Sequence, residues 1–288
     1  MIGSVLELPT DHPGVSDPVY IARRNHLANL SASLELGARP PHVDYTRVEN
    51  DVWSTVHAAL TALHADYAVT EYRTAAAVLD LPTDRVPQLA DVSDRLTELT
   101  GWRLCAVPGL VSTAEFFSAL ADRCFPSSQY VRHASVPFYT PEPDVIHELI
   151  GHANSLASPR IAGLYERAGQ VAGRLTNPRL AELLGKVFWF TLEFGLAREQ
   201  GMLRTYGAGL LSSFGEITNF RNADVRPFDT TAMGEFTDYE ISTFQDVLFA
   251  AESFGDAEAR LLRFFDQLEA ASPLAETVSR KPIADSVS

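Results

Sequence analysis

Two histidines five residues apart, His147 and His152, lie in the segment Thr140–Ala153, which reads TPEPDVIHELIGHA. Asp144 can cap a helix that begins after the two prolines of this segment. On an ideal α-helix, residues five apart point about 140° away from each other. Both imidazoles can therefore reach one metal ion only if the helix loosens between them. Gly151 permits this because glycine tolerates unusual backbone conformations, so a metal site in this segment would require a distorted helix.

The same spacing bears on the class of metal site. A zinc protease of the HExxH type needs its second histidine one helical turn after the first. That position is Gly151, which argues against a zinc hydrolase. A zinc hydrolase nevertheless stays open as the alternative from a different class of enzyme.

A third candidate ligand stands in the segment 187–196, which reads VFWFTLEFGL and has Glu193 as its only ionisable group. A carboxylate among apolar neighbours is unfavourable unless it is paired or bound to a cation. Two histidines and one carboxylate form the facial triad of Fe(II) enzymes that activate oxygen. Taken alone, the histidine pair can be a structural accident and Glu193 can pair with Arg198. The residues by themselves thus leave the metal site and its substrate open.

The composition limits the remaining classes of function. The chain has 288 residues, of which 46% are apolar and 21% are charged, as in an ordinary soluble domain. The formal net charge of −14, without a Lys/Arg stripe, argues against nucleic acid as a partner. The longest apolar stretch is too short to span a bilayer, and the first residues carry no secretion signal. Cys105 and Cys124 give no disulfide framework, so we expect a cytoplasmic enzyme without a membrane partner.

The hydrophobic periodicity predicts a mainly helical fold. Ser112 with Glu115, and Ser213 with Glu216, are typical of capping boxes, and Asp256 is a candidate cap for the last helix. Short strands are expected near 102–111, 203–212 and 238–245. The expected helices cover residues 19–36, 48–63, 91–99, 116–125, 177–199 and 256–268.

Several long stretches resemble the pterin-dependent aromatic amino acid hydroxylases: TPEPDVIHELIGH, WFTLEFGL, YGAGLLSSFGE, PQLADVSDRL, QYVRHASVPFYTPEPD and STFQDVLFAAESF. The resemblance covers roughly residues 20–270 and implies that family's mainly α fold, with a few short β-strands. It implies one catalytic domain at 19–271, between a loose N-terminal segment at 1–18 and a loose C-terminal tail at 272–288. This leaves no room for the family's N-terminal regulatory domain, and the tail lacks the heptads of a tetramerising helix. We therefore expect a monomer.

The resemblance also implies roles for individual residues. His147, His152 and Glu193 would bind Fe(II), and the guanidinium of Arg132 would grip the substrate carboxylate with two parallel hydrogen bonds. Thr140 and Ser212 would help to hold the amino-acid backbone. Relatives often have tyrosine where this chain has Phe188. The tetrahydropterin co-substrate would lie against Gly109, Val111, Thr113, Phe116, Glu148 and Phe188.

Three positions bear on which ring is hydroxylated. Trp189 should pack against the substrate ring, and the phenylalanine and tyrosine enzymes of the family carry tryptophan there. Leu110 also speaks against tryptophan as the substrate. Ile241 stands where tyrosine enzymes place an aspartate, although tryptophan enzymes use isoleucine there. The balance favours a monooxygenase that acts on L-phenylalanine with O2 and reduced pterin.

A tryptophan hydroxylase of the same family is the alternative, and a catalytically dead binding protein of the same fold is a further rival. Attack at the para carbon, which gives tyrosine, is the family's usual outcome. Some bacterial relatives in antibiotic pathways attack the meta carbon instead. We therefore expect para attack, and meta attack stays open.

Overall fold

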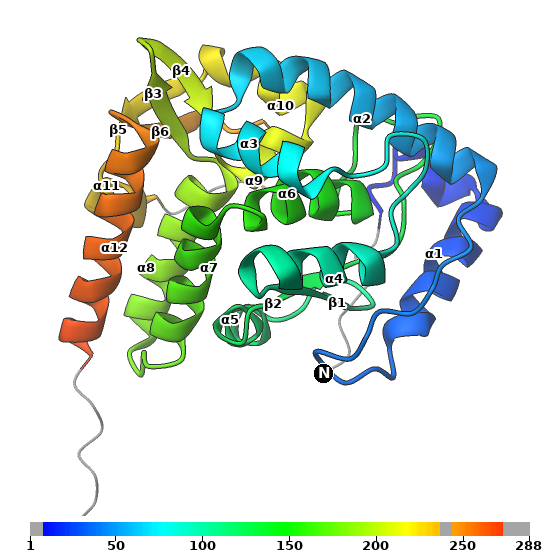
Figure 1. The fold of residues 1–288 in the computed structure, drawn as a ribbon, viewed down its shortest axis with the longest axis horizontal. Coiled ribbons are helices and arrows are strands. Elements are labelled where there is room, and N and C mark those ends of the chain that lie inside the picture. Colours follow the sequence, from blue (N-terminus) through cyan, green and yellow to red (C-terminus); the bar gives the residue numbers. More distant parts are fainter. Residues whose placement is uncertain (1–7, 237–243, 273–288) are drawn as a thin grey trace, which may run out of the picture.

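Helices make up most of the computed structural model, which describes residues 8–236 and 244–272 (Figure 1). This confirms the mainly α fold that the sequence predicted. Pro13–Ser16 (η1) and Phe220–Asn222 (η4) are short 3-10 helices, and His147–Ala153 (η2) and Trp189–Glu193 (η3) are π-helices. The α-helices are α1 Pro18–Ser31, α2 Arg47–Tyr67, α3 Thr70–Leu79, α4 Leu89–Thr100, α5 Thr113–Ala121, α6 Asn154–Leu156, α7 Pro159–Ala172, α8 Pro178–Phe188, α9 Ala208–Ser212, α10 Phe214–Asn219, α11 Thr230–Glu235 and α12 Phe254–Ala271.

Two small sheets accompany the helices. In the first, β1 (Arg103–Ala106) pairs with β2 (Cys124–Ser127) in parallel. In the second, the strand order is β4-β3-β6-β5, built from Leu196–Glu199 (β3), Met202–Thr205 (β4), Asp224–Pro227 (β5) and Val247–Ala251 (β6). Among the strand pairs of the described residues, only β3–β4 is antiparallel, as expected for strands joined by a short turn.

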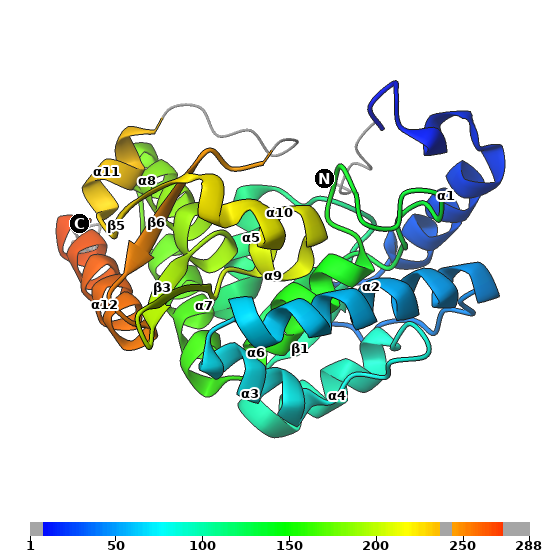
Figure 2. The same ribbon diagram turned by 90° about the horizontal axis from the view of Figure 1, so that it is seen from above.

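Helix α7 lies at the centre of the helical packing, because it contacts both α5 and α12. Figure 2 shows α12 at one end of the molecule and α2 reaching toward the opposite end, with α7, α9 and α10 between them. One continuous apolar core runs through these elements, with Trp53, Trp102 and Tyr165 fully buried in it. Among the described helices, none combines the length and the apolar character that a membrane crossing requires.

Two predicted helices end earlier than the sequence suggested. The helix predicted through residue 125 stops at Ala121, because Arg123 adopts a positive φ of 52° and turns the chain into β2. The helix predicted through residue 199 stops being α-helical at Phe188 and continues as η3 to Glu193. Residues 196–199 then form β3, since both of its neighbouring strands offer backbone partners. Tertiary pairing thus overrides the local helical pattern in both places.

The expectation of no disulfide was wrong. Cys105 of β1 and Cys124 of β2 are buried, their Cα atoms are 6.0 Å apart, and the structure joins them as a disulfide. The sequence separates them by 19 residues, and only the parallel pairing of β1 with β2 brings them together. The strand predicted near 238–245 falls mainly on residues outside the described part of the chain.

Candidate metal centre

The predicted loosening of the helix between His147 and His152 is confirmed, because this turn is the π-helix η2. Hydrogen bonds between residues five apart place such residues on one face of a helix. Gly151 is needed here for a close approach of neighbouring backbone. A Cβ atom on Gly151 would lie 2.7 Å from the carbonyl oxygen of Ala208 in α9. A second π-helix, η3, ends at Glu193 and faces the first across the site.

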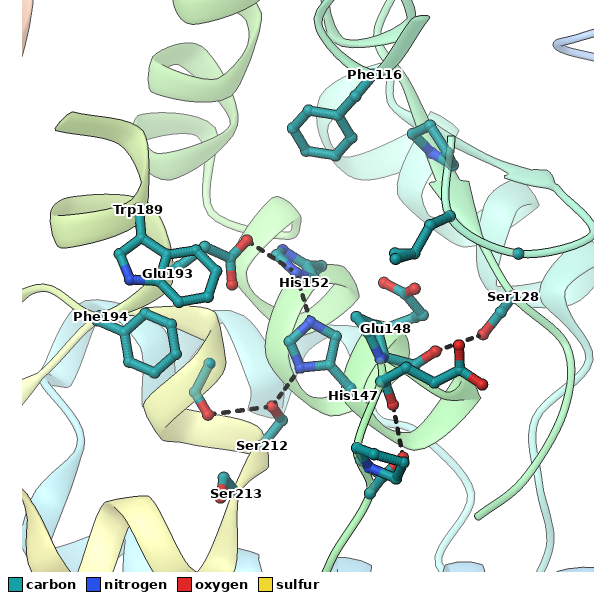
Figure 3. A pocket seen from close by; sticks show the side chains of 18 of the residues that line it. Phe116, Ser128, His147, Glu148, His152, Trp189, Glu193, Phe194, Ser212 and Ser213 are labelled. Carbon is teal, nitrogen blue, oxygen red and sulfur yellow. Dashed lines mark hydrogen bonds and ion pairs between the residues drawn. The ribbon is translucent and has the colours of Figure 1, made fainter. Parts of the chain in front are cut away.

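Three side chains from these two π-helices lie in a row, with His152 between His147 and Glu193 (Figure 3). The Nε2 atoms of His147 and His152 are 3.0 Å apart, and Nε2 of His152 is 3.2 Å from Oε1 of Glu193. Glu148 also lies close, because one ligand atom from each of His147, Glu148 and His152 fits within 4.8 Å. The two imidazoles are therefore within reach of a single ion, with the carboxylate of Glu148 close to both and that of Glu193 close to His152.

The outer nitrogens of both imidazoles have hydrogen-bonding partners of their own. Nδ1 of His147 is 2.7 Å from Oγ of Ser212, which donates to the carbonyl oxygen of Ala208. Nδ1 of His152 is 3.0 Å from Oη of Tyr165. If each Nδ1 carries the proton, each Nε2 presents a lone pair, since a neutral imidazole has one donor and one acceptor nitrogen. Two facing lone pairs beside a carboxylate fit a bound cation.

Burial controls the charge of these groups. It lowers the pKa of His147 to about 4 and holds the pKa of His152 well below its usual range. It raises the pKa of Glu193 to about 8, and it raises the pKa of Glu148, where the nearby carboxyl of Glu193 adds to the effect. Burial thus disfavours the charged forms of all four side chains, and a bound cation would favour the ionised carboxylates.

A cavity of about 600 Å³ opens over these residues, a volume typical of a small-molecule site. Every candidate site residue within the described part of the chain lines it; the candidate Ile241 lies outside the described residues. Beside His147, His152 and Glu193, the candidates that line the cavity are Gly109, Val111, Thr113, Phe116, Arg132, Thr140, Glu148, Phe188, Trp189 and Ser212.

Hydrogen bonds within the protein hold the polar candidate residues Arg132 and Thr140 in place in the cavity wall. Arg132 is buried and forms a two-pronged ion pair with Asp144, with N–O distances of 2.9 and 2.7 Å. Its Nη1 lies 3.5 Å from the carbonyl oxygen of Pro137, so a guanidinium with five N–H groups keeps further donors. Thr140 donates to the carbonyl oxygen of Glu142.

Two residues that the sequence analysis did not single out hold Trp189 in place. Its indole N–H donates to Oε1 of Gln245 over 3.0 Å, and its ring packs at 4.6 Å from the ring of Phe194. The backbone N–H of Gln245 donates to the carboxyl of Glu216, which also lines the cavity. The Gln245–Glu216 contact joins residues 29 apart and the Trp189–Gln245 contact joins residues 56 apart. A local sequence pattern therefore cannot predict them.

The pattern of the family described as biopterin-dependent aromatic amino acid hydroxylase matches residues 2–283 of the chain. The chain is 45% identical over 255 residues to phenylalanine 3-hydroxylase of Streptomyces coeruleorubidus. This alignment covers 88% of this chain and 91% of that protein. It is 39% identical to phenylalanine-4-hydroxylase of Dictyostelium discoideum, over 91% of this chain and 60% of that protein.

Solved structures agree with the sequence comparisons. Phenylalanine hydroxylase of Chromobacterium violaceum with bound oxidised Fe(III) has a TM-score of 0.76 at 29% identity, covering 87% of this chain and 91% of that chain. A structure of the same enzyme with iron(III) and oxidised cofactor 7,8-dihydrobiopterin has a TM-score of 0.75 at 29% identity. The comparison covers 93% of this chain and 96% of that chain.

Proposed function

The chain belongs to the biopterin-dependent aromatic amino acid hydroxylases, and we propose that it hydroxylates L-phenylalanine at the meta carbon of the ring. The reaction would use Fe(II), O2 and a tetrahydropterin. The observation that carries this proposal is the contact of two imidazoles and a carboxylate, with His152 between His147 and Glu193, in a mainly apolar cavity. Iron and reduced pterin, when bound, supply the oxidising chemistry that inserts one oxygen atom of O2 into the ring.

His147, His152 and Glu193 would hold the iron, in agreement with the facial triad. Glu193 is preferred to Glu148 as the third ligand because its Oε1 already lies 3.2 Å from Nε2 of His152. Glu148 is turned toward the backbone N–H of Ser128, on the side of the cavity where the pterin is proposed to lie. Val111, Thr113 and Phe116 would complete the pterin site with Gly109 and Phe188.

The remaining residues would bind and orient the amino acid. Arg132 would receive its carboxylate through the N–H groups that Asp144 leaves unused, and Thr140 lines the same cavity. Trp189, held by Gln245, would give the substrate ring a fixed surface. The hydroxyl of Ser212 is engaged by His147, so we propose that it orients this imidazole in addition to its predicted place near the substrate backbone.

The ring position is the point at which the proposal departs from the sequence analysis, which favoured para attack. Identity to a phenylalanine 3-hydroxylase is 45%, against 39% for a phenylalanine-4-hydroxylase. This difference supports the meta carbon. A displacement of about 1 Å between reacting atoms is enough to change the outcome of an oriented reaction, so small differences in the cavity wall suffice.

Product analysis tests the proposal. The purified protein is incubated with Fe(II), a tetrahydropterin and either phenylalanine, tyrosine or tryptophan, and the products are separated by chromatography. We expect meta-tyrosine from phenylalanine. Para-tyrosine as the main product would refute the ring position, and hydroxytryptophan without any product from phenylalanine would refute the substrate. The expected monomer is tested by sedimentation, where a tetramer would contradict it.

A further inference from the structure

Tyr165 lies on the side of His152 that faces away from the cavity. It belongs to α7, is 1% exposed, and places its hydroxyl oxygen 3.0 Å from Nδ1 of His152. The same hydroxyl donates to the carbonyl oxygen of Leu192, at 3.4 Å. Leu192 directly precedes Glu193 in η3. One side chain therefore touches a candidate ligand and the backbone beside another.

The direction of these hydrogen bonds follows from their partners. A carbonyl oxygen can only accept, so the Tyr165 hydroxyl gives its proton to Leu192. Its oxygen is then the acceptor for the Nδ1–H of His152. In a neutral imidazole this leaves the Nε2 of His152 without a proton and aimed at His147 and Glu193.

Aromatic neighbours prevent Tyr165 from turning away. Its ring meets those of Phe188, Phe125 and Trp102 edge to face, at centroid distances of 5.4, 6.1 and 6.3 Å. Phe125 also stacks on the imidazole of His152 at 4.3 Å. None of these neighbours except Trp102 carries a polar side-chain atom, so the phenol hydroxyl has few other partners.

We propose that Tyr165 is a positioning residue of the metal site. Its hydroxyl holds His152 in the tautomer and orientation that present Nε2 to the ion, and it ties this ligand to the π-helix that carries Glu193. Ser212 occupies the equivalent place on His147, so each imidazole has one hydroxyl partner. The identity of the ion as Fe(II) rests on the proposed function, whereas the role of Tyr165 applies to any divalent metal bound at this point.

The test replaces Tyr165 by phenylalanine, which removes the hydroxyl and keeps the ring. Loss of an outer partner of a metal-bound histidine lowers metal affinity by about 10–100-fold, and we expect this loss for Co(II) titrated into the metal-free protein. Tyr72→Phe is the matched control. Tyr72 is also fully buried, and its hydroxyl donates to the carbonyl oxygen of Ile150 in η2, which is not a ligand.

Tyr72→Phe should therefore keep the affinity for Co(II) within about twofold of the unmodified protein. Tyr165→Phe with unchanged affinity, or an equal loss in both variants, would overturn the proposal. A second measurement does not depend on the variant folding. ¹⁵N NMR of the metal-free, unmodified protein should show the proton of His152 on Nδ1, and a proton on Nε2 would overturn the proposal. Absence of any hydroxylated product would instead refute the proposed function and leave both results standing.

Discussion

Glu216→Gln is a substitution whose effect on stability can be worked out from the structure. Glu216 is 7% exposed, and its carboxyl accepts the backbone N–H of Gln245 over 3.1 Å. Burial raises the pKa of Glu216 to about 7, which this hydrogen bond partly offsets and the nearby Asp246 increases. Glutamine keeps the accepting oxygen and the shape of the side chain, so the substitution removes little besides the ionisation.

The direction in which pH changes the stability of the folded protein follows from proton binding by Glu216. The folded protein holds the Glu216 proton up to about pH 7, whereas the unfolded chain releases it near its ordinary pKa of about 4.5. The folded state is therefore favoured below pH 4.5, and this contribution is lost as the pH rises to about 7. A shift of about 2.5 units corresponds to about 3 kcal/mol at most.

Urea unfolding at several pH values measures this effect. We expect the free energy of unfolding of Glu216→Gln to exceed that of the unmodified protein by about 3 kcal/mol at pH 8 and by about 1 kcal/mol at pH 5. Glu98→Gln is the control, because Glu98 is an exposed surface residue paired with Arg95. A difference for Glu216→Gln that does not change between pH 5 and pH 8 would refute the reasoning.

Two further predictions concern the metal site. Gly151→Ala should lower the free energy of unfolding by about 1–3 kcal/mol and weaken Co(II) binding, because the new Cβ meets Ala208. Thermal unfolding measures the loss of stability. Gly163→Ala is the control, because a Cβ there meets nothing within 4 Å. Because burial raises the pKa of Glu193 to about 8, metal binding should release about one proton at pH 6.5 and almost none at pH 9.5. Calorimetry in buffers of different ionisation enthalpy counts these protons, and equal release at both pH values would contradict the prediction.

The sequence was informative wherever local spacing dictates geometry. His147 and His152 are five residues apart with Gly151 between them, and a metal ion shared by both required a departure from the α-helix, which the structure has as η2. The capping box of Ser112 with Glu115 also forms as predicted. Ser213 accepts the backbone N–H of Glu216 as expected, but the carboxyl of Glu216 turns to Gln245 in place of the helix start.

Contacts between distant segments could not be predicted in this way. Asp256 was expected to cap the last helix, yet Ser253 takes that place and accepts the backbone N–H of Asp256. The hydroxyl of Tyr165 reaches His152 only because α7 packs beside η2, and a tyrosine on a buried helix face reads as core. The pairing of Cys105 with Cys124 likewise depends on the register of two strands.

The account rests on Glu193, and not Glu148, being the carboxylate that binds the metal with the two histidines. The most direct test compares Glu193→Ala with Glu148→Ala for Fe(II) bound per chain, under anaerobic conditions, and for hydroxylated phenylalanine formed after O2 is admitted. We predict that Glu193→Ala binds Fe(II) at least about 10-fold more weakly and forms no product, while Glu148→Ala still binds the metal. Unchanged Fe(II) binding and product formation by Glu193→Ala would contradict the account.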